Sequence, residues 1–255
     1  MYRPWLLAAA LLCISLGAAA QTPREIISAA DKVRNPGQPF RSTDTLTEYV
    51  SGKPKDQDQL VVFSKEDPAT RQFRNLVRYV APPRDAGKMV LLDGQNLWFY
   101  DPASKASVRI SPQQRLIGQA AVGDVLTINF VVDFAGTLLG DETIGDADRQ
   151  QRTCWHLDLK ATTDTAIYNR IEYWVEHGSF RPIKAKFYSD SGRLLKILYY
   201  RGYQQQLDGV RPTQAVIIDA VDSSLVTTID FGDRRFQDVP EVWFQRDYLP
   251  RLRAD

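Results

Sequence analysis

The sequence has 255 residues, with 32 Lys and Arg against 31 Asp and Glu and a formal net charge of +1. This balance leaves no basic excess, which argues against a nucleic acid or another polyanion as partner. Only two cysteines occur, Cys13 and Cys154. The chain is therefore not a disulfide-stapled scaffold, and its length is sufficient to bury a large core without such staples.

Residues 1–20 have the pattern of a secretory leader. Arg3 gives a short basic start, an apolar run follows, and Ala18-Ala19-Ala20 supplies small residues for a cleavage site. This run is too short to cross a bilayer, and no other run approaches the roughly 20 residues that a spanning helix needs. We predict a signal peptide cleaved after Ala20 and an exported protein in the periplasm of a Gram-negative-type envelope, without a stable membrane span.

The part after the leader begins with a short amphipathic helix and continues as a β meander. Ile26, Ile27 and Ala30 share one face of the predicted helix over residues 23–33. Turn residues then separate short alternating segments, and Asp93-Gly94 is a strong hairpin signal. The predicted strands cover residues 43–50, 59–64, 72–80, 88–92, 96–100 and 106–110.

Residues 111–140 interrupt this pattern and predict a helical insert. Pro112 suits the first turn of a helix, with Ser111 as its cap. Apolar residues follow at roughly helical spacing as far as Gly123, and a second apolar run ends at Gly140. The insert is either a plug that completes the core or a movable lid over an apolar cavity, and the stretch by itself favours the plug.

The β pattern resumes after residue 140. The predicted strands cover residues 152–160, 168–175, 182–188, 194–203, 213–220 and 225–231. Residues 240–252 predict a short terminal helix or a docked extended arm. No repeat or linker divides the chain, so we expect one domain over residues 21–255. Its predicted class is mainly β: an unclosed antiparallel β-barrel, a curled sheet of about eleven strands with short helices as lid or plug.

Residues with catalytic chemistry are sparse. His156 and His177 are the only histidines, and no G-x-S-x-G elbow supports a triad that uses either of them. No Cys and His residues have the spacing of zinc ligands, and no glycine-rich phosphate loop occurs. We therefore predict a protein that is not an enzyme and has no cofactor or metal, with a hydrolase using one of the histidines as a minor alternative.

Aromatic residues stand side by side on several predicted strands. Trp98, Phe99 and Tyr100 are consecutive, so both faces of that strand carry rings, and Tyr173 with Trp174 repeats this arrangement. A strand with one solvated face does not need rings on both sides. Such strands are either covered on both sides or line an apolar ligand cavity. The predicted residues of that cavity and its cover are Trp98, Tyr100, Leu126, Phe130, Phe134, Leu138, Tyr173 and Trp174.

Three segments carry a family resemblance: residues 93–110 with Leu97-Trp98-Phe99-Tyr100, residues 172–196, and residues 240–249 with Trp243-Phe244. With them the sequence resembles the LolA/LolB lipoprotein-carrier superfamily, and more narrowly the outer-membrane lipoprotein-sorting-like proteins found beside RND- or MMPL-type exporters. The resemblance implies an unclosed barrel with a helical lid that holds a lipid, and no enzyme.

In the carrier an interior arginine bonds the lid shut. Arg74 and Arg78 lie on a predicted strand of this sequence, but neither is assigned that role. The stretch 118–124 also departs from the usual pattern of the narrower family, which has a glycine and acidic residues after an arginine-rich strand.

Two functions remain open at this point. In the first, the protein is a periplasmic carrier or chaperone that binds a lipid, or the acyl chains of lipoproteins, for transport or sorting to the outer membrane. In the second, it is a non-enzymatic accessory module of an inner-membrane exporter of the RND or MMPL type, with a filled cavity. A displaceable lipid in the interior distinguishes the first from the second.

Overall fold

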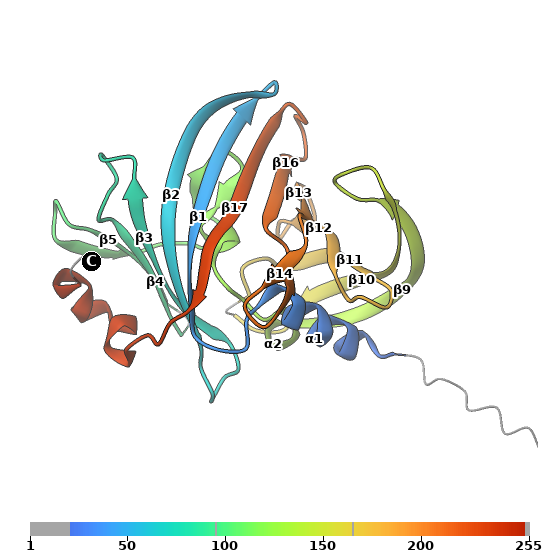
Figure 1. Cartoon of the computed structure of the whole chain (residues 1–255), viewed down its shortest axis with the longest axis horizontal. Coiled ribbons are helices and arrows are strands. Elements are labelled where there is room, and N and C mark those ends of the chain that lie inside the picture. The colour runs from blue at the N-terminus through green and yellow to red at the C-terminus, as the bar shows by residue number, and fades with distance from the viewer. Residues whose placement is uncertain (1–20, 95, 165, 253–255) are drawn as a thin grey trace, which may run out of the picture.

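The computed structural model describes residues 21–94, 96–164 and 166–252. In these residues thirteen strands form one antiparallel sheet, in the order β6-β5-β4-β3-β2-β1-β17-β16-β13-β12-β11-β10-β9 (Figure 1). The predicted leader, residues 1–20, lies outside the described part of the chain. No helix of the described residues is both long enough and apolar enough to cross a membrane.

The sheet consists of two meanders. The first meander contains β1 (Phe40–Val50), β2 (Lys53–Glu66), β3 (Phe73–Ala81), β4 (Met89–Asp93), β5 (Asn96–Asp101) and β6 (Ala106–Arg109). The second contains β9 (Phe134–Gly145), β10 (Gln151–Ala161), β11 (Arg170–Glu176), β12 (Pro182–Tyr188), β13 (Leu194–Arg201), β16 (Gln214–Asp219) and β17 (Leu225–Phe236). Two small strand pairs stand apart, namely β7 (Arg115–Ile117) with β8 (Ala120–Ala121) and β14 (Gln204–Gln206) with β15 (Gly209–Arg211).

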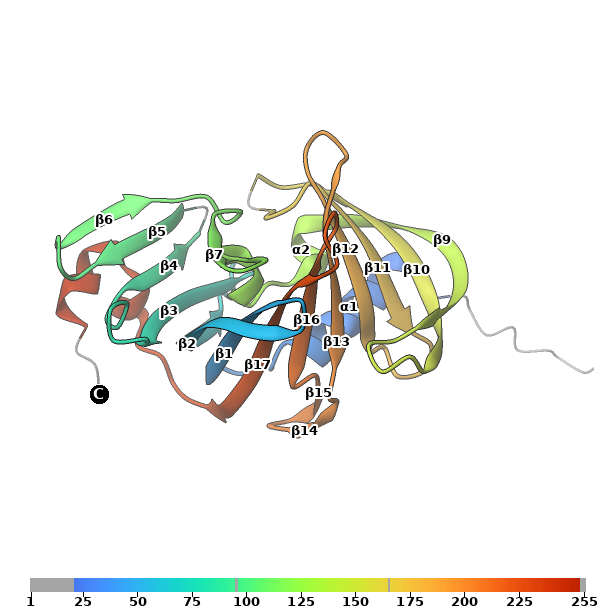
Figure 2. The ribbon, with the colours of Figure 1, turned by 90° about the horizontal axis from the view of Figure 1, so that it is seen from above.

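The two meanders are joined by β1 and β17, which are the first and last strands of the sheet in chain order. β1 pairs with β17 along its length, from Phe40 opposite Phe236 to Val50 opposite Leu225. β6 and β9 are the two edges of the described sheet and do not pair with each other. Figure 2 shows the sheet curling so that β6 and β9 lie at opposite ends, with α1, α2 and β7 between them. The prediction of a mainly β, unclosed antiparallel barrel is confirmed.

Helix α1 (Pro23–Arg34) lies across the concave face of the sheet, as its apolar stripe predicts. Thr22 and Glu25 form a capping box at its start, in which each side chain accepts from the other residue's backbone N–H. Ile26 and Ile27 are buried against the sheet. The helix approaches β9 so closely that a Cβ on Gly136 would lie 2.5 Å from Cδ1 of Ile27, so any larger residue there would force the Ile27 side chain to move.

The prediction of a helical insert over residues 111–140 is wrong. This stretch contains β7, β8, the 3₁₀ turn η1 (Val122–Val125), the single-turn helix α2 (Phe130–Asp133) and the start of β9. The apolar run after Gly123 contains two kinds of secondary structure, because Phe130 belongs to the helix α2 whereas Leu138 belongs to the strand β9. Short apolar runs do not distinguish strand from helix. Here the pairing of β9 with β10, from Phe134 opposite Ala161 onward, decides for strand.

The C-terminal segment covers the convex face of the first meander. Residues 240–252 form the 3₁₀ turns η2 (Glu241–Phe244) and η3 (Arg246–Arg251). Phe244 and Leu249 are buried there in a second core that includes Tyr100, and Trp98 packs against it. Phe99 packs on the concave core instead. The consecutive rings of β5 therefore belong to a strand that is covered on both sides.

Residues 111–133, here named the cover segment, lie over the concave face. Within the described chain, the backbone-to-backbone hydrogen bonds of residues 111–132 lie inside this segment, except that the Phe134 N–H at the start of β9 donates to the Phe130 carbonyl oxygen. Its β7–β8 turn rests on β17, where the Gln119 N–H donates to Oγ1 of Thr227 at 2.7 Å. Gly118 in this turn has a φ of +53°, and a Cβ there would lie 2.3 Å from the same oxygen.

We expect Gly118→Ala to lift the β7–β8 turn from β17 and to lower the free energy of unfolding by about 1–3 kcal/mol, because backbone strain and overlap with Thr227 add. Urea titration measures the loss. Gly52→Ala is the matched control, because Gly52 also has a positive φ, +75°, but no atom within 4 Å of its Cβ position. Equal losses in the two variants would show that the contact with Thr227 has no role.

Candidate functional site

Apolar side chains of the cover segment fill the concave trough of the sheet. Leu126, Ile128 and Phe130 are each less than 10% exposed and belong to the same core as the inward side chains of both meanders. The ring of Phe130 meets the rings of Phe134 and Tyr173, with centroids 5.5 Å away in each case. Tyr173 is fully buried. The centre of the trough is therefore occupied by a segment that is not part of the sheet.

The end of α1 holds the middle of the cover segment. Arg34 Nη2 and Asn35 Nδ2 each donate to the carbonyl oxygen of Ile128 at 2.9 Å. The carboxylate of Asp31 accepts from the N–H of Val131 at 2.8 Å and also pairs with Arg34 at 2.5 Å. The Arg34 guanidinium lies 4.0 Å from the centre of the Phe130 ring. Arg34 thus connects α1 to both the Ile128 carbonyl oxygen and the Phe130 ring of the cover segment.

Arg34 remains a cation inside the core. Burial by itself lowers the pKa of Arg34, but Tyr173, Tyr200 and Asp31 act in the opposite direction, and the net shift is upward. Burial raises the pKa of Asp31, and Arg34 opposes that rise. Removing one partner of such a pair leaves a buried charge alone, which costs about 3–5 kcal/mol. The contact between α1 and the cover segment therefore depends on both residues together.

Two side-chain amides hold the cover segment where a neighbouring strand would otherwise do so. Asn75 on β3 accepts from the Thr127 N–H at 2.9 Å and donates to the Thr127 carbonyl oxygen at 3.0 Å. Gln72 does the same for Asn129, accepting at 2.8 Å and donating at 3.2 Å. Asn75 is fully buried. The amides satisfy the backbone of the cover segment without making it part of the β ladder.

Asp124 attaches the 3₁₀ turn of the cover segment to β13 and to Tyr168. Its carboxylate pairs with the ammonium of Lys196 on β13, and it accepts from the Tyr168 hydroxyl at 2.9 Å and from the Ala121 N–H at 2.7 Å. The side chains of Asp124 and Lys196 are 2% and 7% exposed. Burial and the neighbouring Asp124 raise the pKa of Tyr168 well above its usual range, so its hydroxyl stays a donor.

One end of the trough is polar. Asp44 on β1 is buried near Arg234 of β17, and one oxygen of Asp44 and Nε of Arg234 have no hydrogen-bond partner in the described residues. Burial raises the pKa of Asp44 to about 6, with Arg234 and Ser42 opposing the rise. Burial also lowers the pKa of Arg234 to about 10, which Asp44 partly offsets.

The cavities around the cover segment differ in size and surroundings. Beneath it, a cavity of about 50 Å³ lies among Phe130, Phe134, Phe187 and Leu198, and another of about 80 Å³ lies beside Asp44. A third, of about 200 Å³, lies between the segment and the ends of β4 and β5. Outside, a pocket of about 370 Å³ opens between the β7–β8 turn and β13. Ligand sites usually have about 300–1,000 Å³, so the inner cavities are small for one.

Comparison with known proteins places this arrangement in a family. A LolA superfamily protein from Nitrosomonas europaea is 31% identical, and the match covers 90% of this chain and 100% of that one with a TM-score of 0.79. The chain belongs to the LolA superfamily. A family model described only as that of an uncharacterized protein matches residues 71–251. No match was found among curated proteins.

Two further solved structures share the fold of this LolA superfamily member. A putative outer membrane lipoprotein-sorting protein domain from Vibrio parahaemolyticus is 20% identical, with a TM-score of 0.73 and coverage of 89% of this chain and 98% of that one. A DUF1329 family protein from Desulfovibrio piger is 19% identical, with a TM-score of 0.73 and coverage of 89% and 97%. The chain therefore has a lipoprotein-sorting-like carrier fold, as the resemblance of its sequence implies.

The arginine that contacts the cover of this LolA superfamily member is Arg34, which sequence reasoning did not single out. Arg74 instead faces the C-terminal segment, 2.7 Å from Glu241 and above the ring of Phe244. Asn75, Asp124 and Lys196 were also missed. Asn75 and Lys196 did leave a signal, since each is a polar residue on the inward face of a strand whose next inward residues, Val77 and Leu198, are apolar.

The structure brings together four of the eight predicted cavity residues. Leu126, Phe130, Phe134 and Tyr173 meet in the concave core. Trp98 and Tyr100 lie beneath the C-terminal segment, and Trp174 belongs to a small cluster with Cys154. Leu138 on β9 is 38% exposed. A ligand-contacting role therefore stays a prediction for the first four, and the others lie elsewhere in the molecule.

Both histidines are engaged with rings and carboxylates. His156 stacks on Trp174 with ring centroids 4.2 Å apart and lies 3.2 Å from Glu142. His177 stacks on Trp155 at 4.0 Å. No group of three or more His, Cys, Asp or Glu suited to a metal occurs in residues 21–94, 96–164 and 166–252. That the protein is not an enzyme stays a prediction.

We expect Asn75→Ala to loosen the cover segment selectively. The substitution removes the partner of the part-buried N–H and C=O of Thr127, and the cost of an unpaired buried polar group, about 1–3 kcal/mol, is its upper limit for each. Hydrogen exchange by mass spectrometry should show faster exchange in peptides covering residues 120–132. The control is Asn169→Ala, which removes an exposed amide that bonds to Asp190. Unchanged exchange at 120–132 in Asn75→Ala would contradict this role.

Asp44 should leave a signature in the pH dependence of stability. Between its ordinary pKa near 3.8 and about 6, the folded protein holds a proton that the unfolded chain has lost. The contribution of Asp44 to the free energy of unfolding therefore falls by up to about 1.4 kcal/mol per pH unit across this window as pH rises. Asn cannot ionise, so the stability of Asp44→Asn relative to the unsubstituted protein should increase from pH 4 to 6 and then level off.

Urea titrations at pH 4, 5, 6 and 7 measure this difference. Asp93→Asn, at an exposed hairpin position, serves as the control and should follow the unsubstituted protein at every pH. A constant difference between Asp44→Asn and the unsubstituted protein over the whole range would show that Asp44 ionises normally.

Proposed function

We propose that this LolA superfamily member is a periplasmic carrier that binds a lipid, or the acyl chains of a lipoprotein, in the concave trough after the cover segment moves away. Transport or sorting to the outer membrane is the process that such a carrier serves. Residues 1–20, with their leader pattern, support export of the chain. Catalysis has no part in this proposal.

The observation that carries the proposal is how the trough is filled. Leu126, Ile128 and Phe130 occupy it, yet their segment is attached to the sheet through side chains rather than through a β ladder. Such a segment can leave without unpairing any strand of the thirteen-stranded sheet. Its departure would expose a wide apolar face that a hydrocarbon chain can cover in its place.

The energy of this exchange favours a long hydrocarbon guest. Displacing the cover segment costs the bonds of Arg34, Asn75 and Asp124 described above, as well as the burial of its apolar side chains. A bound acyl chain returns about 0.8 kcal/mol for each CH₂ group that it buries. A chain of a dozen or more carbons therefore offsets the loss of several hydrogen bonds, each with a net contribution of about 1 kcal/mol.

The small inner cavities favour a second candidate function. With about 50 and 80 Å³ under the cover segment, the trough is filled in this structure. A protein that keeps this state would act as a non-enzymatic accessory module of an inner-membrane exporter of the RND or MMPL type. In that case the apolar core stays closed, and binding to the exporter depends on the outer surface.

The two functions differ in whether lipid enters the trough. We expect gentle purification followed by solvent extraction and mass spectrometry to yield bound lipid, and a fluorescent fatty acid to bind and be displaced by that lipid. The double variant Gln72→Ala/Asn75→Ala should bind the fluorescent fatty acid faster, because the cover segment has lost both amide contacts. The matched control is Gln151→Ala/Gln205→Ala, at two exposed positions.

The carrier function is refuted if neither the unsubstituted protein nor the loosened variant binds fatty acid or releases lipid. If no lipid is found and an exporter co-purifies with the protein, the accessory function is established instead.

A further inference from the structure

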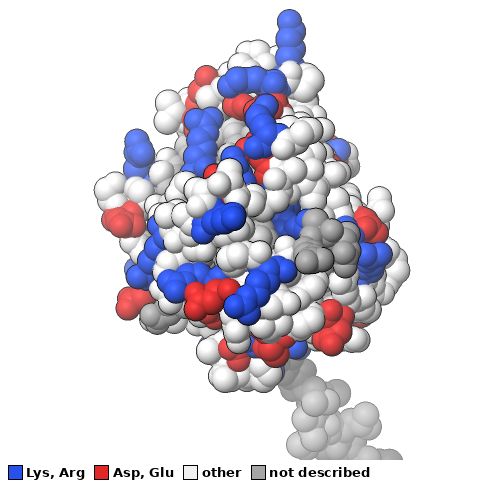
Figure 3. Space-filling view, turned by 90° about the vertical axis from the view of Figure 1, so that its left-hand side faces the viewer, with Lys and Arg blue, Asp and Glu red and all other residues white. Residues whose placement is uncertain are grey.

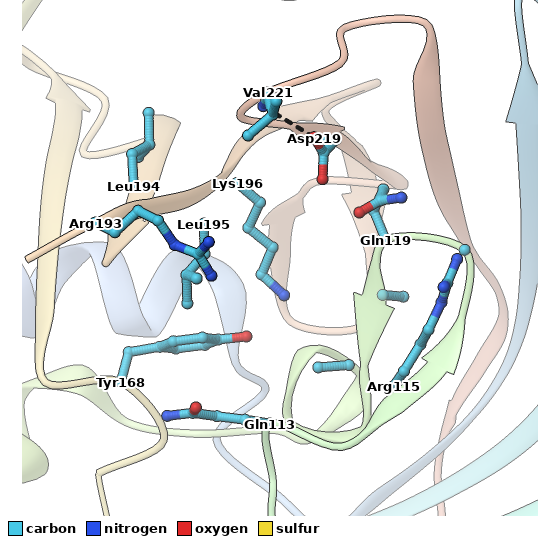
Figure 4. A pocket seen from close by; sticks show the side chains of 13 residues that line it. Gln113, Arg115, Gln119, Tyr168, Arg193, Leu194, Leu195, Lys196, Asp219 and Val221 are labelled. Carbon is cyan, nitrogen blue, oxygen red and sulfur yellow. Dashed lines mark hydrogen bonds between the residues drawn. The ribbon is translucent and has the colours of Figure 1, made fainter. Parts of the chain in front are cut away.

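The pocket outside the cover segment has a chemistry different from that of the trough. It has a volume of about 370 Å³ and lies between the β7–β8 turn on one side and the starts of β13 and of the loop after β16 on the other. Three cationic side chains line it: Arg115 on β7, Arg193 just before β13, and Lys196 on β13. Figure 4 shows the Lys196 ammonium and the Arg193 guanidinium pointing into the pocket above the ring of Tyr168, with Arg115 on the opposite wall.

Two of these cations, Arg115 and Arg193, are weakly neutralised, whereas Lys196 is paired with Asp124. The Arg193 side chain has no ion-pair or hydrogen-bond partner in the described residues, and Arg115 has a single carboxylate, that of Glu48, at 3.7 Å. Asp219 is the acidic residue in the lining, and one of its oxygens accepts from the N–H groups of Val221 and Asp222 at 2.8 Å each. The lining therefore has three cationic side chains and one acidic side chain, and the two arginines are the cations that lack a close carboxylate.

Charges are arranged differently on another face of the molecule. Figure 3 shows the side where β5 and the C-terminal segment lie in Figure 1, and there Lys and Arg side chains are interspersed with Asp and Glu. On that side Glu241 neutralises both Lys65 and Arg74, at 2.5 and 2.7 Å. The outer pocket differs because its two arginines lack such close partners.

The outer pocket and the trough share a wall. Tyr168 lines both the outer pocket and the apolar cavity beside Phe130, and Asp124, which accepts from the Tyr168 hydroxyl, also lines that cavity. Lys196 stands at the same boundary, with its ammonium 5.1 Å from the Tyr168 ring centre and 5.7 Å from that of Phe187. A polar, cationic mouth thus adjoins an apolar interior, with Asp124, Tyr168 and Lys196 between them.

We propose that the outer pocket binds the anionic head group, a phosphate or a carboxylate, of an amphiphile whose hydrocarbon tail enters the trough past Tyr168. The inference rests on the proposed carrier function and narrows its ligands to anionic lipids. Arg115 and Arg193 attract the head group, and Lys196 binds it at the boundary between mouth and trough. The chemistry shared by phosphate and carboxylate oxygens fits guanidinium and ammonium donors.

Lys196 also couples the head group to the cover segment. In this structure the carboxylate of Asp124 is paired with the Lys196 ammonium, in the position that the anion of a ligand would take. Asp124 keeps two further donors, the Tyr168 hydroxyl and the Ala121 N–H, when Lys196 turns to another anion. Exchange of Asp124 for a head group therefore removes the ion pair between the cover segment and β13. Binding of the anion therefore frees the 3₁₀ turn around Asp124, whereas the β7–β8 turn that carries Arg115 keeps its bond to Thr227 of β17.

The test compares ligands that share one tail. Hexadecyl phosphate, hexadecanol and inorganic phosphate are titrated separately against displacement of a bound fluorescent fatty acid, and calorimetry measures inorganic phosphate directly. We expect hexadecyl phosphate to bind about tenfold or more tightly than hexadecanol, since one charge-assisted contact supplies such a factor. Inorganic phosphate should not bind at comparable concentrations, because it has no tail.

The variant Arg115→Ala/Arg193→Ala removes two exposed arginines of the mouth and should keep the fold. It should lower the affinity for hexadecyl phosphate about tenfold and leave that for hexadecanol unchanged. The control Arg24→Ala/Arg235→Ala makes the same change in net charge at exposed positions outside the pocket and should change neither affinity.

Each outcome has one meaning. Equal binding of the phosphate and the alcohol, both unaffected by Arg115→Ala/Arg193→Ala, overturns the head-group site and leaves the carrier function standing. Inorganic phosphate that binds as tightly as hexadecyl phosphate and is lost in that variant overturns the lipid as the source of the anion. Failure of every tailed ligand to bind refutes the carrier function itself, and with it this inference.

Discussion

The structure depends on how the concave face of one wide sheet is shielded from water. The described sheet has thirteen strands, and its edges β6 and β9 do not meet. Side chains of the two meanders cannot reach across such a trough, so another part of the chain has to fill it. α1 and the cover segment do so, with Ile27, Ile128 and Phe130 among the buried contacts. Unfilled apolar surface of this extent would be a strong driving force for association.

The way the cover segment is attached distinguishes it from the rest of the core. Strands of the sheet are held by cooperative ladders, whereas residues 111–132 depend on separate side-chain bonds from Arg34, Asn75, Gln72 and Lys196. Each of these bonds is modest once exchange with water is considered. Together they give a closed state that is well defined, and they can still be replaced one at a time by contacts with a guest.

The polarity of the trough changes along its length. The middle is apolar around Phe130, whereas the boundary with the outer pocket is formed by Asp124 and Lys196. A gradient from a cationic mouth to an apolar interior is the arrangement that an amphiphile requires, because its charged end keeps polar partners while its tail leaves water. In the proposed carrier the same gradient would orient the guest, since the reverse orientation would bury an anion among rings.

Local pattern by itself determined α1 and the two meanders. Alternation, Asp93-Gly94 and the apolar stripe of residues 23–33 are short-range signals, and they specify strands, a hairpin and a helix without reference to distant residues. The family resemblance added the unclosed barrel. Only the tertiary structure decided that residues 134–145 are a strand, because pairing with β10 outweighs an ambiguous apolar run. It likewise decided that Arg34 contacts the cover, and that Asp124 meets Lys196. Those partners lie 94 and 72 positions apart in the chain, so no local pattern could place them together.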